Sequence, residues 1–235
     1  MLIGILETGH APEQLQARHG DYGAMFERLL GGRGFSFRRY DVEHGELPQD
    51  PAEADAWLIT GSRHGVNDPL PWIAPLEAFI RKAREAHVPV VGICFGHQLL
   101  AKALGGKVER HPGGWIVGPQ SYDFGGRSLR LNAWHQDQVT RPPADARTIA
   151  TGPDCAHAAL AYGDWAISLQ AHPEFDDAFL AGLIDTRGRG VVPEPRLEAG
   201  RAALGPGPES DEVARMLAEF LTRAHRAPAR EDKER

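Results

Sequence analysis

The sequence predicts an α/β fold in which helices cover both faces of a mostly parallel sheet. Short apolar runs alternate with segments of helical spacing through the first half of the 235-residue chain, which is typical of a parallel sheet with crossover helices. After Gly106 the sequence changes to many glycines and short alternating stretches, which favour antiparallel hairpins. We therefore expect a parallel sheet followed by an antiparallel extension.

The amino-terminal half supplies the predicted parallel strands. Four short runs are apolar or alternating, as buried or half-buried strands are, and they are LIGILE (2–7), FSFRRYDV (35–42), ADAWLIT (54–60) and VPVVGI (88–93). Apolar residues recur at helical spacing in the segments between and after these strands, namely 12–30, 72–86 and 96–104.

The carboxyl-terminal half is predicted to begin with hairpins and to end with helices. Residues 106–135 and 147–172 have the alternating pattern of antiparallel strands. A helix is expected near 176–185, an irregular loop over 186–208 and an amphipathic helix over 211–226. We expect residues 1–225 to form a single domain and residues 226–235 to be a frayed tail.

Composition and charge exclude several classes of protein. The formal net charge of −6, without a basic block, argues against a nucleic-acid-binding surface. The start MLIGILETGH lacks the basic region and long apolar run of a signal peptide, and no apolar run is long enough to span a membrane. With only two cysteines, a disulfide framework is not expected, and a reducing cytoplasm fits best.

A single residue joins the last predicted parallel strand to the helix that follows it. In VVGICFGHQLLAKALGG (90–106), Cys94 stands between Gly92 and Gly96. A one-residue switch from strand to helix imposes unusual dihedrals on Cys94, and side chains at the flanking positions would crowd the turn. The thiol would lie at a helix amino terminus, where unpaired N–H groups favour the reactive thiolate. The amide of Phe95 could then hold an oxyanion.

A structural interpretation of this corner stays open, because a buried cysteine can occupy an ordinary turn between a strand and a helix. The other cysteine provides a contrast. Cys155, in GPDCAHA, has no apolar strand before it and no helix after it, so we interpret it as structural or incidental. Cys94 is therefore the candidate nucleophile.

A cysteine nucleophile needs a proton acceptor that a third group orients. In WAISLQAHPEF, His172 lies on the face of an alternating segment opposite to the apolar residues. Pro173 biases His172 toward an extended conformation, and in an extended segment residues two apart point the same way. Glu174 can therefore reach the ring of His172 and fix its tautomer, although a lone His-Pro-Glu also occurs by chance on surfaces.

The other histidines lack a partner at an informative spacing. His97 is interpreted as a hydrogen-bonded structural residue, and His135 in AWHQDQV as one that shapes a pocket. The sequence contains no H-x-E-x-x-H or C-x-x-C, so we expect no metal site. It also has neither a G-x-G-x-x-G after a strand nor a Walker lysine loop, so we expect no cofactor.

The combination of GICFGHQLLAKALGG with a downstream HPE resembles the class I, triad-type glutamine amidotransferases. It is most similar to stand-alone members like the glutaminase domain of GMP synthase and the γ-glutamyl peptidases, over about residues 40–185. The resemblance implies a three-layer, flavodoxin-like fold with a mostly parallel sheet, helices on both faces and a small antiparallel β extension. It also implies hydrolysis of the γ-carboxamide of glutamine, or of a γ-glutamyl amide or peptide, through a thioester on the cysteine.

The resemblance further implies roles for individual positions. The nucleophile and its triad partners would be Cys94, His172 and Glu174. The oxyanion hole would be made by backbone amides of Gly61 or Ser62, in the loop after an earlier strand, and of Phe95. Three further positions are implied to contact the small-molecule substrate: Gln98, Trp134 and His135.

Two departures from the family pattern bear on these roles. The loop TGSRHG replaces a Gly-Gly-Pro or Gly-Pro-Gly turn, so the choice between Gly61 and Ser62 stays open. In GGWIVG, Ile116 replaces an acidic residue of many relatives, so substrate contacts near Trp115 are expected to differ.

The partner and the exact class of activity also stay open. Well-known members of the family feed ammonia to a synthetase domain, for which this chain has no room. The resemblance therefore allows either a separate synthetase subunit or direct hydrolysis of a γ-glutamyl bond. Two alternatives are a cysteine peptidase or DJ-1-like stress protein, which usually has a histidine directly after the cysteine, and a non-catalytic regulatory protein of the same fold.

Overall fold

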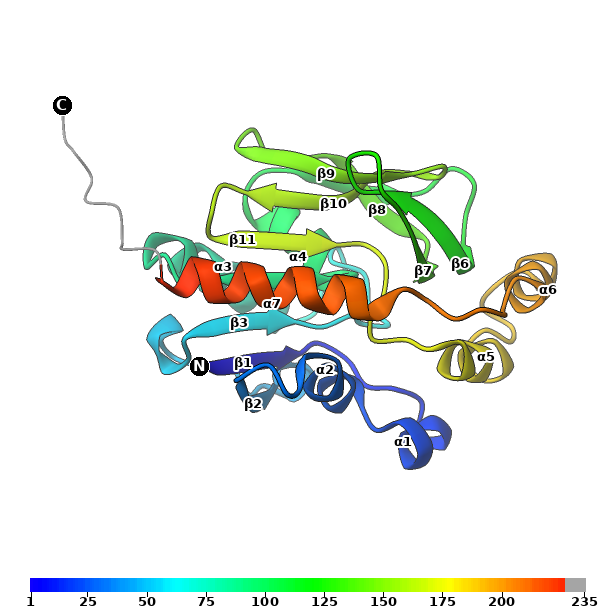
Figure 1. Ribbon diagram of the computed structural model, residues 1–235, viewed down its shortest axis with the longest axis horizontal. Helices are drawn as coiled ribbons and strands as arrows, with labels where there is room; N and C mark the ends of the chain where they lie inside the picture. Colours follow the sequence, from blue (N-terminus) through cyan, green and yellow to red (C-terminus); the bar gives the residue numbers. More distant parts are fainter. Residues whose placement is uncertain (227–235) are drawn as a thin grey trace.

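The centre of the molecule is a nine-stranded sheet whose first part is parallel (Figure 1). The computed structural model describes residues 1–226. Neighbouring strands in the order β2-β1-β3-β4-β11 run parallel, which is the 2-1-3-4-5 order of flavodoxin-like sheets. Their bounds are Leu2–Glu7 (β1), Ser36–Asp41 (β2), Ala56–Ile59 (β3), Val90–Ile93 (β4) and Ala166–Leu169 (β11). The predicted α/β class is confirmed.

The sheet continues beyond β11 as the predicted antiparallel extension. Four strands follow in the order β10-β9-β6-β7, each antiparallel to its neighbour. Their bounds are Cys155–Tyr162 (β10), Ala146–Gly152 (β9), Ile116–Asp123 (β6) and Ser128–His135 (β7). A separate two-stranded antiparallel sheet is formed by β5 (Lys107–Arg110) and β8 (Asp137–Arg141).

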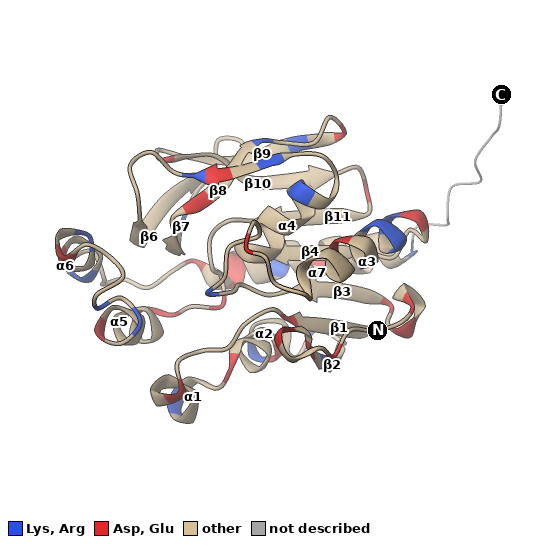
Figure 2. Cartoon of the chain, turned by 180° about the vertical axis from the view of Figure 1, so that it is seen from behind, with Lys and Arg blue, Asp and Glu red and all other residues tan. Residues whose placement is uncertain are grey.

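Helices cover both faces of the parallel part of the sheet. Figure 1 shows α7 (Ser210–Arg226) in front of the strands, and α2 (Tyr22–Leu30) packs on the same side. Two helices cover the opposite face, α3 (Ile73–Glu85) and α4 (Phe95–Ala103), and they lie in front in the reverse view of Figure 2. The arrangement is the three-layer structure that the family resemblance implied.

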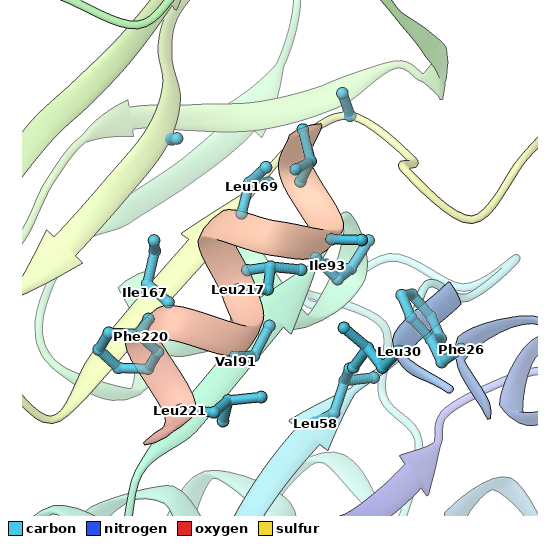
Figure 3. Packing of buried hydrophobic residues seen from close by; sticks show 14 of the residues in the cluster. Phe26, Leu30, Leu58, Val91, Ile93, Ile167, Leu169, Leu217, Phe220 and Leu221 are labelled. Carbon is cyan, nitrogen blue, oxygen red and sulfur yellow. The ribbon is translucent and has the colours of Figure 1, made fainter. Parts of the chain in front are cut away.

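The face under α7 shows why this helix forms where it does. Leu217, Phe220 and Leu221 recur at three- and four-residue spacing and are buried against Val91 and Ile167 of the sheet (Figure 3). Acidic residues occupy its first turn and basic residues its last, which suits the helix dipole.

The face under α3 is organised around one large side chain. Trp57 of β3 is fully buried, and its ring meets that of Phe79 edge to face with centroids 5.0 Å apart. A Cβ atom at Gly4 would lie 2.1 Å from the Trp57 ring. Glycine at position 4 of β1 is therefore required by this tryptophan.

Two predicted segments differ from the observed structure here. The end of the segment 147–172, which was predicted to be antiparallel, is β11, which is parallel to β4 on one side and antiparallel to β10 on the other. The single helix expected over 12–30 is two helices, α1 (Glu13–His19) and α2, because Gly20 turns the chain at φ 75° and Asp21 caps α2. Short 3₁₀ turns follow at Val42–His44 and Pro51–Glu53. The helix expected near 176–185 is confirmed and is α5 (Asp177–Asp185).

The prediction that residues 186–208 form an irregular loop was wrong in part. The segment contains α6 (Glu194–Ala202), which begins after Pro193 and buries Leu197. The high glycine, proline and arginine content of this segment concealed a short helix that is stabilised mainly by packing.

The described part of the chain ends with α7 at Arg226. The frayed tail predicted over 226–235 lies outside the described residues, apart from Arg226 at the end of α7. We propose that residues 1–225 form one domain. Within the described part of the chain, no helix is long and apolar enough to cross a membrane. Figure 2 shows acidic and basic positions interspersed over several elements, and some of them form ion pairs, such as Arg84 with Asp145 at 2.6 Å.

Candidate active site

Cys94 occupies a strained corner between β4 and α4. Its backbone has φ 51° and ψ −100°, which confirms the unusual dihedrals expected from the sequence. A Cβ atom at Gly92 would lie 2.5 Å from the carbonyl oxygen of Gly96, and one at Gly96 would lie 2.5 Å from that of Ile59. The two glycines are therefore needed by the turn itself and by its contact with β3.

The corner is also held by backbone hydrogen bonds. The amide of Cys94 donates to the carbonyl of Leu169 at 2.8 Å, and the amide of Gly96 donates to the carbonyl of Thr60 at 3.2 Å. Phe95 is the first residue of α4, so its N–H has no acceptor inside the helix. These contacts fix the thiol at the carboxyl end of the parallel strands, beside a free helical amide.

His172 and Glu174 meet as the sequence predicts, although the segment is not one continuous strand. β11 ends at Leu169, and His172 pairs separately with Asn132, whose carbonyl accepts its amide hydrogen at 2.9 Å. Nδ1 of His172 lies 2.7 Å from Oε1 of Glu174. The ring of Phe175 stacks on the imidazole with centroids 4.0 Å apart and planes at 3°. The imidazole is thus held on its edge and on its face.

The electrostatic setting of His172 favours its protonated form. Burial alone would lower the pKa of His172, but the charge of Glu174, together with the charge that Cys94 carries when ionised, raises this pKa to about 10. A hydrogen bond with the Cys94 side chain also contributes to this rise. Nε2 of His172 has no nitrogen or oxygen partner among the described residues, so it can exchange a proton with Cys94 or with a bound molecule.

The loop after β3 brings the two candidate residues together. A Cβ atom built at Gly61 would lie 2.8 Å from Cε1 of His172 and 3.6 Å from Cβ of Cys94. Both side chains therefore flank Gly61, and any larger residue there would crowd the imidazole. Cys94 and His172 also line the same pocket.

Two buried threonines determine how the loop after β3 is oriented. The hydroxyl of Thr60 donates to the carbonyl oxygen of Gly61 at 3.0 Å, and Oγ1 of Thr8 lies 3.2 Å from the same oxygen. In a trans peptide the C=O and the following N–H point in opposite directions. The amide of Ser62 is therefore turned away from the threonines, and Ser62 lines the pocket with Cys94 and Phe95.

The three residues implied to contact substrate all line this pocket, which encloses about 370 Å³. Two of them also hold the chain at Asp137: the side-chain amide of Gln98 donates to its carbonyl at 2.7 Å, and Nδ1 of His135 lies 3.1 Å from the same oxygen. Burial lowers the pKa of His135 to about 3, so its ring is neutral and donates this bond. Trp134 lies on β7 beside His135, with its ring 5.8 Å from that of Trp115. A role in binding remains a prediction for all three.

Several pocket residues were missed by the sequence reasoning. Tyr22 comes from the first turn of α2, and Arg187 follows α5. The Arg187 guanidinium donates to the Tyr22 hydroxyl at 2.9 Å and to the carbonyl of His10 at 2.8 Å. Neither residue belongs to a motif, so no local signal in the sequence pointed to them.

Two residues interpreted as structural are buried away from solvent. Nδ1 of His97 lies 2.7 Å from the hydroxyl oxygen of Ser168, a hydrogen-bond distance. Burial lowers the pKa of His97 to about 3, so the imidazole stays neutral. Burial raises the pKa of Cys155 to about 12. These settings suit structural roles.

One group of side chains in the described residues has the donor atoms of a metal site. Donors of His10, Asp41 and His44 lie within 4.8 Å of one another. Both ring nitrogens of His10 already contact carboxylates, at 2.5 Å from Asp21 and 3.2 Å from Asp41. Burial opposes charge on this ring, but those carboxylates raise the pKa of His10. A metal would have to displace a proton there.

Comparison with known proteins adds to the geometry. The family described as glutamine amidotransferase class-I matches residues 36–178. γ-Glutamyl peptidase 4 of Arabidopsis thaliana is 33% identical over 71% of this chain and 73% of its own length. The glutamine-hydrolysing GMP synthase of Thermus thermophilus is 30% identical over 66% of this chain and 32% of its own length. The structure of a glutamine amidotransferase from Thermotoga maritima covers 97% of this chain and 99% of its own, with a TM-score of 0.73 at 22% identity, a likeness of fold.

Proposed function

Because the chain belongs to the glutamine amidotransferase class-I family, we propose that it hydrolyses γ-glutamyl amides with Cys94 as nucleophile and His172 as acid and base. The similarity to a γ-glutamyl peptidase and to a glutamine-hydrolysing synthase supports cleavage of glutamine or a γ-glutamyl amide in general. The steps below use only side chains, backbone amides and water, so the proposal requires no cofactor.

In the first half-reaction the sulfur of Cys94 attacks the γ-carbonyl carbon of the substrate. The carbonyl oxygen becomes an oxyanion, which the amides of Phe95 and Ser62 stabilise. The imidazolium of His172 then donates its Nε2 proton to the leaving nitrogen as the carbon–nitrogen bond breaks. Ammonia or an amine departs, and a γ-glutamyl thioester remains on Cys94.

In the second half-reaction water hydrolyses the thioester. The neutral imidazole of His172 takes a proton from the water, whose oxygen attacks the thioester carbon. The same two amides stabilise the second oxyanion, and the carbon–sulfur bond breaks to release glutamate and the Cys94 thiolate. Glu174 keeps the ring oriented and stabilises its charged form in both half-reactions.

The observation that carries this proposal is the proximity of Cys94 and His172, which line one pocket and flank Gly61. Those residues are 78 positions apart in the chain, yet a Cβ at position 61 would lie 2.8 Å from the imidazole of His172 and at a contact distance of 3.6 Å from Cβ of Cys94. A nucleophile and its base need this proximity.

The orientation of the Gly61 carbonyl supports Ser62 as the second oxyanion donor. Thr8 and Thr60 hold that carbonyl on the far side of the loop, so the following amide points the opposite way. Gly61 is kept small by the imidazole, a requirement that is independent of its amide. We therefore favour the amide of Ser62 over that of Gly61.

The experiment that tests the proposal measures glutamate, ammonia and amine separately. Purified protein is incubated with glutamine, a γ-glutamyl dipeptide and a γ-glutamyl polyamine. We expect Cys94→Ala to lower glutamate release by at least about a thousandfold. Cys155→Ala is the matched control and should retain activity, because Cys155 lies outside the pocket. Undiminished turnover in Cys94→Ala would reject the mechanism, and an inert wild-type chain would favour a non-catalytic protein.

A second candidate follows from the similarity to a glutamine-hydrolysing GMP synthase. If this chain works as a glutaminase subunit, ammonia release would require a separate synthetase protein. Direct cleavage of γ-glutamyl peptides by the chain alone would indicate a peptidase.

Both cysteines are free, which suits a reducing compartment and supports the cytoplasm as the place of action.

A further inference from the structure

The pocket holds one arginine whose charge has no carboxylate beside it. Among the described residues, no carboxylate lies within 4.0 Å of the Arg187 guanidinium, although Arg187 lines the pocket with Cys94 and His172. Arg63, on the same pocket, differs because its guanidinium lies 2.8 Å from Oε1 of Glu43. A partly buried, unpaired cation in a pocket attracts an anionic ligand group.

Two hydrogen bonds hold the Arg187 guanidinium in place and leave its other N–H donors unpaired. One terminal nitrogen donates to the Tyr22 hydroxyl at 2.9 Å and the other to the His10 carbonyl at 2.8 Å. A guanidinium has five N–H donors, so three stay available. The backbone around it is fixed as well, since the amide of Gly188 donates to the carbonyl of Leu183 at 2.8 Å. Arg187 is therefore oriented in advance for a planar anion such as a carboxylate.

A chain of contacts places Arg187 on the side of the pocket next to His172. Phe175 stacks on the imidazole at 4.0 Å, Tyr22 lies beside Phe175 with ring centroids 5.7 Å apart, and the Tyr22 hydroxyl bonds Arg187. In the proposed function, His172 donates a proton to the leaving nitrogen. The leaving group must therefore lie on this side, with the glutamyl chain across the scissile carbonyl from it.

We propose that Arg187 binds a carboxylate of the leaving group, and that the preferred substrates are γ-glutamyl peptides whose departing amino acid or short peptide has a free carboxylate. This inference rests on the proposed function and names its substrate class. Glutamine would lack the contact, because the ammonia that it releases has no anionic group. The volume of about 370 Å³ lies within the range of roughly 300–1,000 Å³ that is usual for small-molecule sites.

The test centres on two substrates, γ-glutamyl-alanine and γ-glutamyl-alaninamide, that differ only in this carboxylate. Wild-type protein is assayed with γ-glutamyl-alanine, γ-glutamyl-alaninamide, γ-glutamyl-alanyl-glycine and glutamine, and kcat/KM is measured for each. We expect at least one free-acid peptide to exceed the amide by about ten- to a hundredfold, the size of a charge-assisted hydrogen bond. The longer peptide shows whether the carboxylate reaches Arg187 from the first or the second residue.

Two substitutions of Arg187 and a neighbouring control complete the design. Arg187→Met should reduce the ratio of kcat/KM between acid and amide to near one, and Arg187→Lys should restore part of it. Arg189→Met is the matched control, because the Arg189 side chain is 74% exposed and lies outside the pocket. It should leave the ratio unchanged. If Arg187→Met is poorly folded, the ratio of kcat/KM between acid and amide in the wild type and in Arg187→Lys decides whether Arg187 binds the carboxylate.

Two results would overturn the assignment while the proposed function stands. One is a wild-type protein that cleaves the acid and the amide equally well. The other is an equal loss of kcat/KM in Arg187→Met on glutamine, γ-glutamyl-alanine and γ-glutamyl-alaninamide. That result would mean that Arg187 binds the carboxylate of the glutamyl part. A wild-type protein that releases glutamate from none of the four compounds would instead overturn the proposed function, and this inference with it.

Discussion

Nδ1 of His172 lies 2.7 Å from Oε1 of Glu174, and the two side chains are only 4% and 1% exposed. In this setting each group depends on the other, because the second carboxylate oxygen of Glu174 has no hydrogen-bond partner among the described residues. A buried carboxylate beside an imidazole stabilises the imidazolium strongly. This pair explains why His172 would keep its proton until the leaving nitrogen needs it.

The first prediction concerns the pH dependence of the reaction. The imidazolium of His172 is the acid, so activity falls as the pH rises through its pKa, which the charges of Glu174 and Cys94 raise to about 10. Glu174→Gln removes one of those charges and lowers this pKa. We expect the alkaline limb of kcat/KM to move by about one to three pH units toward neutral.

The matched control for this prediction is Glu194→Gln, on the exposed first turn of α6. It removes a carboxylate of the same chemistry that lies outside the pocket. Its pH profile should coincide with that of the wild type. An alkaline limb that keeps its position in Glu174→Gln would mean that another group sets it.

The second prediction concerns the reactivity of the two cysteines. Cys155 is 3% exposed, and burial raises its pKa to about 12, so almost none of it is ionised at neutral pH. Cys94 is also buried but opens onto the pocket. Iodoacetamide at pH 7 should add one label per chain, and mass spectrometry should locate it on Cys94. The Cys155→Ala variant should be labelled to the same extent, whereas labelling of Cys155 in the folded protein would contradict this account.

The third prediction concerns the glycine after the nucleophile. A Cβ at Gly96 would lie 2.5 Å from the carbonyl oxygen of Ile59, a backbone atom that cannot move without shifting β3. Gly96→Ala should therefore lower the free energy of unfolding by about 1–3 kcal/mol and reduce kcat. Gly205→Ala is the control, since a Cβ there meets nothing within 4 Å. Denaturant unfolding and turnover are measured on both, and equal stability of the two variants would count against the crowded corner.

Local spacing in the sequence was enough to predict the elbow and the His172–Glu174 contact. A strand that passes into a helix through Cys94, with a glycine two positions to either side, can adopt few backbone conformations. His172 and Glu174 flank a single proline, so they stay close in any conformation. The parallel arrangement of the amino-terminal strands was indicated by their alternation with helices. Each of these features depends on neighbours in the chain.

The features that the sequence could not supply depend on packing between distant segments. Tyr22 and Arg187 meet across 165 positions, and their contact exists only because α2 and the end of α5 lie on the same side of the sheet. The formation of α6 likewise depends on what that segment packs against. Helical periodicity does not record such partners.

The fourth prediction tests the threonines that orient the loop after β3. Thr8 is fully buried, and its Oγ1 lies 3.0 Å from the Thr60 carbonyl and 3.2 Å from that of Gly61. Thr8→Val keeps the shape but leaves two buried carbonyls with fewer partners, which should cost about 1–3 kcal/mol of unfolding free energy. The Gly61 carbonyl then keeps only the Thr60 hydroxyl as a side-chain donor, so the peptide between Gly61 and Ser62 is held less firmly and kcat should fall by more than KM rises.

Thr8→Ser is the matched variant, because it keeps the hydroxyl and loses only a methyl group. It should recover most of kcat while staying somewhat less stable than the wild type. Iodoacetamide labelling of Cys94 separates the two effects, since it needs the thiol but not the oxyanion donor. If Thr8→Val loses labelling and kcat together, the substitution has disturbed the whole site. If kcat alone falls and the serine restores it, the hydroxyl acts through the loop that holds the amide of Ser62.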